Sequence, residues 1–235
     1  MCTHKKHHDL RLDNRVLEPE VMDGADEARD YDSMDHTGVN RSFVDDLLLQ
    51  TTLFEDSQVF SVLDLGTGTA QIPIELCRRN NMVSVTGVDL AYSMLELGRE
   101  NVARAGLDTR ISLQPYDAKQ LPWAENHFPV VMSNSILHHI AKPALVLKEA
   151  LRVVQSGGLM FFRDLLRPSD QAALNHLVEI YTADDSAHQR KMFENSLRAA
   201  LSLSEIRILV KQLGYDPQAV HASSDRHWTM ILMAK

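Results

Sequence analysis

Short apolar runs alternate with longer amphipathic stretches through the middle of the chain. Apolar runs with the length of buried strands lie at residues 60–65, 83–90, 111–118, 129–135 and 157–166. The stretches between most of them carry apolar residues at helical spacing. Strands that alternate with helices of about 10 to 15 residues are typical of right-handed crossover connections. The pattern therefore predicts an open, doubly wound α/β fold built on a mostly parallel sheet.

The last third of the chain departs from this alternation. Residues 169–200 predict a helix-rich insertion after the fifth strand, and a further helix is expected over 203–215. Two strand candidates then follow at 219–224 and 228–235, separated only by Asp225-Arg226-His227. So short a link predicts that this last pair runs antiparallel.

The N-terminal region divides into two parts. Residues 1–35 are polar and interrupted by Pro19 and Gly24, which predicts a tail or a lid. Residues 40–54 place Phe43, Leu47, Leu48 and Leu49 at helical spacing and predict an amphipathic helix. We expect residues 1–57 to form this tail and lid helix, and residues 58–235 to form the main domain.

Composition and charge narrow the class of protein. Among 235 residues, 44% are hydrophobic and 24% are charged, values typical of a globular chain. The net charge of −8 disfavours a nucleic-acid partner. Two cysteines give neither a disulfide framework nor a CxxC metal site, and no apolar run reaches the roughly 20 residues of a membrane helix. We expect a cytoplasmic monomer or homodimer without a metal site or a membrane span.

Candidate chemistry gathers where the predicted strands end, because ligands of open parallel sheets bind beyond the carboxyl ends of the strands. Gly66 and Gly68 follow the first strand, and two glycines at this spacing let the backbone turn sharply near a ligand. Gln71 stands where a dinucleotide fingerprint needs its third glycine, so a pyrophosphate cofactor is disfavoured. Asp89 ends the second strand at ribose-binding spacing, and Asp117 could receive an exocyclic amine. These residues indicate an adenosine-containing ligand.

At this point the chain resembles the class I S-adenosylmethionine-dependent methyltransferases, in particular the small-molecule branch with the ubiquinone and menaquinone C-methyltransferases. The segments that carry the resemblance are VLDLGTGTA, GVDLAYSML, YDA before LPW, SNSILHHI and LRVVQSGGLMFFRD. They span about Val59 to Asp164. The resemblance implies a Rossmann-like, seven-stranded sheet of order 3-2-1-4-5-7-6 with the last strand antiparallel. It also implies a methyl transfer from S-adenosylmethionine, with S-adenosylhomocysteine as product, to a small-molecule acceptor.

The resemblance also implies roles for individual residues. Asp64 and the turn with Gly66, Thr67, Gly68 and Gln71 would hold the methionine part of the cofactor. Asp89 would bind the ribose. Leu90 and Met94 would flank the adenine, and Asp117 with Ala118 would read its amine. Asn134 and Ser135 would lie under the methionine moiety, and Tyr31 would touch its carboxylate from a lid that also contains Met34 and His36.

Several other residues are open to more than one interpretation. His139 is a candidate for proton transfer, whereas packing is the better interpretation of His138. Arg163-Asp164 is either an exposed ion pair at a strand end or part of the substrate site, so Asp164 stays a second catalytic candidate. The segment Asp225-Arg226-His227-Trp228 is either an ordinary turn or part of the site, since its end of the sheet depends on the register of the strands.

Two further sets of residues extend these alternatives. His4, His7 and His8 lie near the N-terminus, where metal binding would be adventitious. The insertion after the fifth strand is expected to form a substrate lid in which one or two of its side chains face the pocket. The candidates in that insertion are Tyr181, Met192, Phe193, Ser196 and Arg198.

Three other functions compete with the small-molecule methyltransferase. One is a methyltransferase that acts on protein or RNA. The acidic charge and the lack of interleaved basic and aromatic residues disfavour an RNA substrate. A non-catalytic S-adenosylmethionine-binding module would bind the cofactor without turnover. A NAD-dependent oxidoreductase is disfavoured by Gln71 and by the lack of a recognisable Tyr and Lys catalytic pair.

Overall fold

The structure, a computed structural model, describes residues 11–19, 21, 24–51 and 60–235. Three sequence predictions therefore lie outside the described residues. They are the histidines His4, His7 and His8, the end of the helix expected over 40–54, and the domain boundary between residues 57 and 58.

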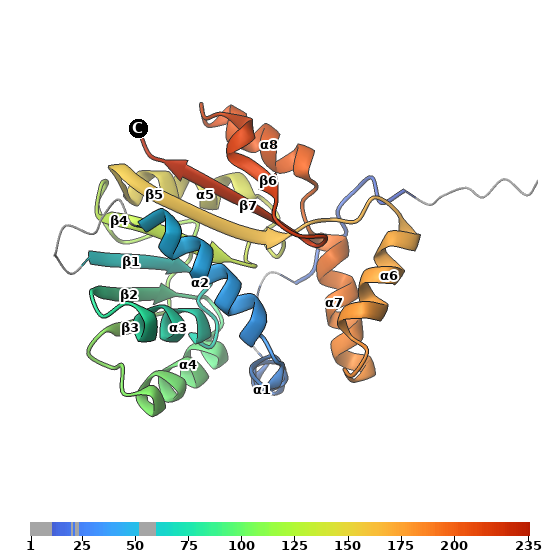
Figure 1. The fold of residues 1–235 in the computed structure, drawn as a ribbon, viewed down its shortest axis with the longest axis horizontal. Coiled ribbons are helices and arrows are strands. Elements are labelled where there is room, and N and C mark those ends of the chain that lie inside the picture. The colour runs from blue at the N-terminus through green and yellow to red at the C-terminus, as the bar shows by residue number, and fades with distance from the viewer. Residues whose placement is uncertain (1–10, 20, 22–23, 52–59) are drawn as a thin grey trace, which may run out of the picture.

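Seven strands form one sheet in the order β3-β2-β1-β4-β5-β7-β6, which confirms the predicted topology (Figure 1). Strands β1 to β5 run parallel, whereas β7 runs antiparallel to both β5 and β6. The strands are β1 (Phe60–Leu65), β2 (Val83–Val88), β3 (Ile111–Gln114), β4 (Phe128–Asn134), β5 (Val154–Leu165), β6 (Val220–Ala222) and β7 (His227–Met233).

Strand β3 ends earlier than the apolar run that predicted it. The run was expected to continue to residue 118, but the strand stops at Gln114. Pro115 follows and has no backbone N–H for the ladder, and the N–H of Tyr116 turns back to the carbonyl of Gln114. Asp117 and Ala118 consequently lie on a loop beyond the sheet.

Helices cover both faces of the sheet and create two cores. On one face α2 (Thr37–Thr51), α3 (Gln71–Arg79) and α4 (Tyr92–Ala105) pack on side chains such as Val62 and Phe161. On the other face α5 (Pro143–Val153) and α8 (Leu203–Gln212) pack on Leu63 and Phe162, the residues that follow Val62 and Phe161 in the same strands. Successive strand residues point to opposite faces, so the continuous apolar runs are explained by burial on both sides.

One helix of the N-terminal region was not visible in the apolar pattern. Helix α1 (Ala25–Ser33) lies within the segment expected to be an irregular tail or lid, and Glu27 accepts a bond from the N–H of Gly24 at its start. Its buried Ala28 packs with Ala91 and Met94. A helix with one small apolar contact gives a weak sequence signal.

The insertion after β5 forms a helical pair, α6 (Gln171–Tyr181) and α7 (Ala187–Ala199), with a small core of its own around Leu174 and Leu197. In Figure 1 this pair stands beside the carboxyl ends of the parallel strands. Residues 11–19 cross the pair as an extended strap, since the N–H groups of Leu12 and Val16 donate to the carbonyls of Ser169 and Arg198. The predicted helical insertion is thus present and anchored.

The register of β7 decides on which side the turn between β6 and β7 lies. Leu165, at the end of β5, is paired with His227 at the start of β7, and the N–H of Leu166 donates to the carbonyl of Arg226. The turn before His227 therefore lies at the ligand-binding edge of the sheet. This position settles on which side of the sheet the turn lies, which the sequence left open.

Candidate active site

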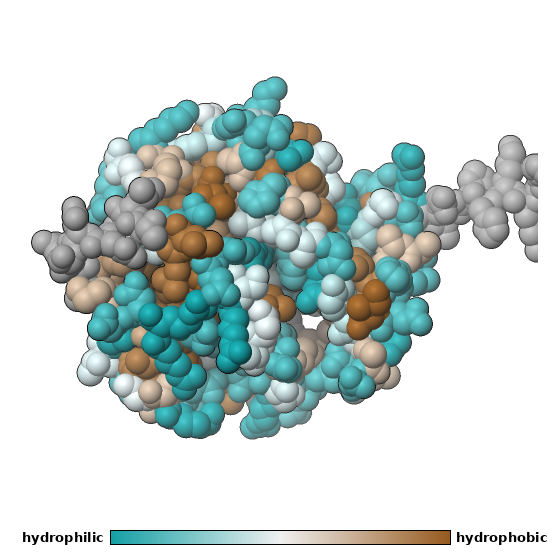
Figure 2. Space-filling model, in the orientation of Figure 1, coloured by the Kyte–Doolittle hydropathy of each residue, from teal (hydrophilic) through white to brown (hydrophobic). Residues whose placement is uncertain are grey.

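A cavity of about 550 Å³ opens at the carboxyl edge of the parallel strands. Helix α1 and the loops that follow β1, β2 and β3 line one half, the α6–α7 pair and the turn before β7 line the other, and the loop that follows β4 lines both. Figure 2 shows the opening between the body of the sheet and the helical pair. The cavity therefore has one half on the sheet and a second half formed by the insertion and the turn.

The turn after β1 has the backbone that its glycines predict. Gly66 and Gly68 line the cavity with φ values of +72° and +53°. A Cβ on Gly66 would lie 2.8 Å from the side chain of Ile136, so only glycine fits there. The hydroxyl-bearing Thr67 is 7% exposed and lies below this surface, outside the cavity lining.

Two of the three predicted acids face the cavity. Asp89 accepts the N–H of Gly68 at 2.9 Å on one oxygen and that of Ala91 at 2.9 Å on the other. Asp117 accepts the N–H of Lys119 at 2.8 Å and pairs with its ammonium at 3.2 Å. Each carboxylate oxygen has two lone pairs, so both acids keep acceptor capacity for a ligand.

Asp64 takes a different position. Its carboxyl is 3% exposed beneath the glycine turn and does not line the cavity. Burial raises its pKa to about 7, with a further contribution from the nearby charge of Asp89. Asp64 can act on a ligand only through the turn above it.

The walls and floor of this half match the remaining predictions in position. Leu90, Met94 and Ala118 line the cavity beside the two acids. Asn134 lines it at the end of β4, and its buried Oδ1 has no hydrogen-bond partner among the described residues. Ser135 follows with a φ of +60°, a conformation that costs a non-glycine residue about 1 to 3 kcal/mol. An unpaired buried acceptor beside strained backbone is typical of a ligand site.

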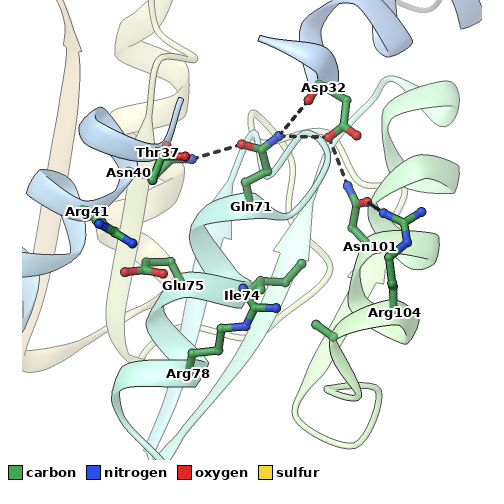
Figure 3. A pocket seen from close by; sticks show the side chains of 11 residues that line it. Asp32, Thr37, Asn40, Arg41, Gln71, Ile74, Glu75, Arg78, Asn101 and Arg104 are labelled. Atoms are coloured by element: carbon green, nitrogen blue, oxygen red, sulfur yellow. Dashed lines mark hydrogen bonds between the residues drawn. The ribbon is translucent and has the colours of Figure 1, made fainter. Parts of the chain in front are cut away.

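Tyr31 and Gln71, both expected near the methionine part, are separated by the structure. Tyr31 lines the cavity from α1 and packs near Ala91 and Met94. Gln71 lies outside this cavity, in a separate polar cleft of about 350 Å³. There its amide donates to Asp32 at 3.0 Å and accepts from Asn40 at 3.2 Å (Figure 3). Gln71 therefore joins α1 and α2 to the start of α3.

A histidine–aspartate pair lies on the floor of the other half. Asp164, 2% exposed, accepts from Nδ1 of His138 at 2.6 Å and from the N–H of Leu137 at 2.6 Å. Burial alone would raise the pKa of Asp164, but the charge of His138 and its hydrogen bond outweigh this effect and lower that pKa. Since His138 lines the cavity and its Nδ1 is occupied, Nε2 is the ring nitrogen available to a ligand.

His139 lies beside this pair, with its ring centroid 4.0 Å from that of His138. Burial, together with the charge of His138, lowers the pKa of His139 to about 3. Its Nδ1 is 3.9 Å from the carboxylate of Glu18 on the strap. A ring with so low a pKa is a weak base at neutral pH, so the geometry favours His138 over His139 as the proton acceptor.

Residues 63–162 match the model of a methyltransferase domain family. A demethylmenaquinone methyltransferase of Porphyromonas gingivalis is 37% identical over 109 residues, which cover 46% of this chain and 44% of that protein. The matched region, residues 63–162, is thus similar to a methyltransferase domain.

Other relatives differ in the reactions their names give. A 27-O-demethylrifamycin SV methyltransferase of Amycolatopsis mediterranei is 26% identical over 158 residues, 67% of this chain and 54% of that protein. A ubiquinone/menaquinone biosynthesis C-methyltransferase of Geotalea daltonii is 29% identical over 121 residues, 51% of each. The chain thus spans about half the length of these relatives.

Solved structures confirm the fold. An S-adenosylmethionine-dependent methyltransferase from Aquifex aeolicus superposes with a TM-score of 0.63 at 15% identity, covering 90% of this chain and 99% of that one. A plantazolicin methyltransferase complexed with S-adenosylhomocysteine gives a TM-score of 0.69 at 12% identity, covering 89% of this chain and 91% of that one. At these identities the likeness concerns the fold.

The cavity fits S-adenosylmethionine. The glycine turn leaves backbone exposed, Asn134 offers an unpaired buried acceptor, and Asp89 and Asp117 offer acceptors for hydroxyl and amine donors. No group of three or more metal-ligating side chains occurs within the described ranges, and none of the described helices is long and apolar enough to cross a membrane.

Arg163 and Asp164 do not form the exposed ion pair that the sequence suggested. The backbone alternation of β5 sends their side chains to opposite faces of the sheet. Arg163 is 5% exposed, donates to Thr229 at 2.9 Å and pairs with Asp46 on α2 at 2.5 Å. Arg163 therefore anchors α2, while Asp164 holds His138.

The insertion contributes more to the cavity than the one or two side chains expected. Four of the five candidates line it, namely Tyr181, Met192, Phe193 and Ser196, whereas Arg198 bonds instead to Glu194 and Gln171 outside it. Further insertion residues, including Asp184 and Asp185, line it as well. The lid residues Met34 and His36 also line it, as do Arg226 and His227 from the turn before β7.

Sequence reasoning missed Arg15 of the strap. Its guanidinium donates to the carbonyl of His138 at 2.8 Å and to that of Ala199 at 2.6 Å. Further bonds reach the carbonyls of Leu137 and Ile140. These contacts are far apart in sequence and lie in a polar segment without periodicity, so no local pattern signals them.

Proposed function

We propose that this chain is a methyltransferase that transfers the methyl group of S-adenosylmethionine to a small-molecule acceptor whose nucleophile is deprotonated by His138. The observation that supports this proposal best is that His138, held by Asp164, lines the same cavity as the glycine turn and the two acids. When bound, S-adenosylmethionine supplies a methyl group on a sulfonium, which needs no further activation.

The residues of this chain have three tasks in such a reaction. Asp89, Asp117 and the backbone at Gly66 and Gly68 would hold the nucleoside and methionine parts. Asn134 would orient a polar group beneath them. These contacts fix the direction of the donor, and alignment of donor and acceptor lowers the barrier of a displacement reaction.

Proton removal is the task of His138. Asp164 accepts from Nδ1, which fixes the tautomer that presents a lone pair on Nε2 to the cavity. The charge of Asp164 stabilises the imidazolium that forms when Nε2 takes a proton from a hydroxyl or an acidic carbon. The enclosing side chains of α6–α7 exclude water from this half.

In a non-catalytic S-adenosylmethionine-binding module, His138 would line the cavity without accepting a proton from a substrate. A [4+2]-cyclase shares the fold with a TM-score of 0.51 at 20% identity, covering 66% of this chain and 53% of that one. The fold therefore hosts reactions other than methyl transfer, and turnover is the deciding measurement.

Calorimetry with S-adenosylmethionine and S-adenosylhomocysteine tests the cofactor assignment. We expect both to bind, and Asp89→Asn to bind more weakly by about 1.5 to 3 kcal/mol for each charged hydrogen bond lost. Because Asp89 also holds Gly68, circular dichroism of the variant must match the parent before affinity is compared. Absence of heat with both ligands would contradict the proposal.

Incubation with isotopically labelled S-adenosylmethionine and a metabolite extract tests turnover. The expected products are small molecules heavier by one methyl group, and His138→Gln should lower their yield by about 10²-fold or more. Binding of S-adenosylhomocysteine without any labelled product would favour the non-catalytic module.

A further inference from the structure

We call the half of the cavity on the sheet the cofactor half, and the half formed by the α6–α7 pair and the turn before β7 the acceptor half. Arg226 stands out among the residues that line the acceptor half. It is the only lysine or arginine in the cavity lining that the structure describes. Its guanidinium carbon lies 3.2 Å from the centroid of the Tyr181 ring, the separation of stacked planes. The side chain is half-buried between the turn before β7 and the end of α6.

The charge of this guanidinium has no anionic partner bonded to it. Within residues 11–19, 21, 24–51 and 60–235, no side chain forms a hydrogen bond or ion pair with the Arg226 side chain. The adjacent carboxylate of Asp225 accepts the hydroxyl of Tyr181 at 2.8 and 3.0 Å and forms no hydrogen bond or ion pair with Arg226. Burial lowers the pKa of Arg226 and outweighs the charge of Asp225, which raises that pKa. The in-plane N–H groups of a stacked guanidinium remain free to bind an acceptor.

Other arginines on the same insertions and strap are satisfied. Arg167 donates to Glu205 at 2.9 Å and to two carbonyl groups of the strap, and Arg198 pairs with Glu194 at 2.9 Å. Leaving a half-buried cation without a bonded anion costs free energy, since desolvation is not offset by pairing. An arginine that lies in a cavity wall without a bonded anion therefore indicates an anionic ligand.

We propose that Arg226 binds a carboxylate of the methyl acceptor, so that the acceptor is a small carboxylic acid with an apolar body. The proposal rests on the methyltransferase function above and names the acceptor class. The apolar body matches the apolar side chains Ile136, Met192 and Phe193, which line the same cavity as Arg226.

The remaining charges in this half favour a carboxylate over a phosphate. Asp35, Asp184 and Asp185 also line the cavity, so a dianion would be repelled where one guanidinium is the only fixed positive charge. A single carboxylate matches the two parallel N–H groups of a guanidinium in charge and geometry. An uncharged acceptor would leave Arg226 unpaired.

Matched pairs of ligands test this assignment on the full chain saturated with S-adenosylhomocysteine. The probes are hydroxybenzoates, hydroxyphenylacetates and hydroxycinnamates, each compared by calorimetry with its own carboxamide. In at least one series we expect the acid to bind about tenfold or more tightly than the amide, as a charged hydrogen bond of this kind predicts. Equal affinities in every series, or no binding in any, would overturn the proposal.

Variants separate recognition from structure. Arg226→Gln should abolish the preference for the acid, and Arg226→Lys should retain part of it because the charge is kept and the fork is lost. Arg198→Gln is the matched control, since that arginine lies outside the cavity, and it should keep the full preference. An acid preference that survives Arg226→Gln would assign the carboxylate to another residue.

Two further measurements distinguish a wrong role for Arg226 from a wrong methyltransferase function. Affinity for S-adenosylhomocysteine and the melting temperature are measured on every variant, because Arg226 lies on the insertion side and not on the cofactor side. Loss of that affinity in the parent chain would remove the methyltransferase proposal. Intact affinity without any acid preference would remove only the role of Arg226.

Discussion

At the scale of single residues, burial decides what each ionisable group can do. Asp64, Asp164 and His139 are all enclosed, yet their pKa values shift for different reasons. Asp164 has a hydrogen-bonded histidine and is held as a carboxylate, whereas Asp64 and His139 are driven towards their neutral forms by desolvation. The sequence predicted a cofactor contact for Asp64 and left Asp164 as an exposed ion pair or a substrate-site residue, but it did not predict the burial of either carboxyl.

Asp64→Asn should change how stability depends on pH. Since burial raises the pKa of Asp64 to about 7, the folded chain holds a proton between about pH 4 and pH 7 that the unfolded chain has released. That difference makes the parent less stable as pH rises through this window. We expect the stability gained by the variant to grow by about 1.4 kcal/mol per pH unit there, measured by urea unfolding.

The matched control for this experiment is Asp30→Asn, which changes an exposed carboxylate on α1. A stability difference between Asp64→Asn and the parent that stays constant across the window would show that Asp64 is ionised throughout. That result would contradict the effect of burial described above.

Asp164→Asn should alter the tautomer of His138. In the parent, the carboxylate accepts from Nδ1 at 2.6 Å and so favours the tautomer protonated at that nitrogen. An amide can present its N–H₂ instead, which favours the opposite tautomer and lowers turnover by about 10²-fold or more. Nitrogen-15 NMR of the histidine ring measures the tautomer without any knowledge of the acceptor. An unchanged tautomer would exclude the positioning role of Asp164.

At the scale of elements, the parts of the fold that sequence predicted are those with local periodicity. Strand β1 and helix α5 follow from short apolar runs and helical spacing, and the glycine turn follows from Gly66 and Gly68. Helix α1 and the strap were missed, because their stability comes from contacts distant in sequence, such as those of Arg15. The His138–Asp164 pair likewise joins the loop after β4 to strand β5 and has no local signal.

The polar contacts of α1 should control closure over the cofactor half. Asp32 accepts from Gln71 and from Asn101, each at 3.0 Å, and so holds the helix that carries Tyr31 (Figure 3). Two hydrogen bonds of about 0.5 to 1.5 kcal/mol each stabilise this position. Asp32→Ala should weaken S-adenosylhomocysteine binding severalfold and increase hydrogen exchange in α1.

Asp30→Ala provides the comparison for α1, because Asp30 is exposed on the same helix. It should leave both affinity and exchange at the parent values. If Asp32→Ala binds as tightly as Asp30→Ala does, the contacts in the polar cleft have no effect on the cofactor half.

At the scale of the whole molecule, buried histidines should make the protein sensitive to acid. Burial lowers the pKa of His139 to about 3 and that of His227 to about 4. Below about pH 6.5 the unfolded chain binds protons at both residues while the folded chain does not, so stability falls as pH falls towards about 4. Each histidine contributes a slope of up to about 1.4 kcal/mol per pH unit.

Asp64 opposes this trend over the same range, so the net slope should correspond to about one proton. His227→Gln should reduce the slope of the parent, and a combined change with His139→Gln should reverse its sign. Urea midpoints across this pH range give the slopes directly. A parent whose stability does not change between about pH 4 and pH 6.5 would contradict the neutral state of the buried rings.

The antiparallel course of β7 has a consequence for how new variants of this protein could be built. Because β7 returns its turn to the ligand edge, two surface insertions, that turn and the α6–α7 pair, form the acceptor half without interrupting the parallel strands of the cofactor half. The turn and the helical pair can each be lengthened, shortened or replaced by another segment. Libraries that graft these two segments together should therefore yield altered acceptor ranges on an unchanged donor site.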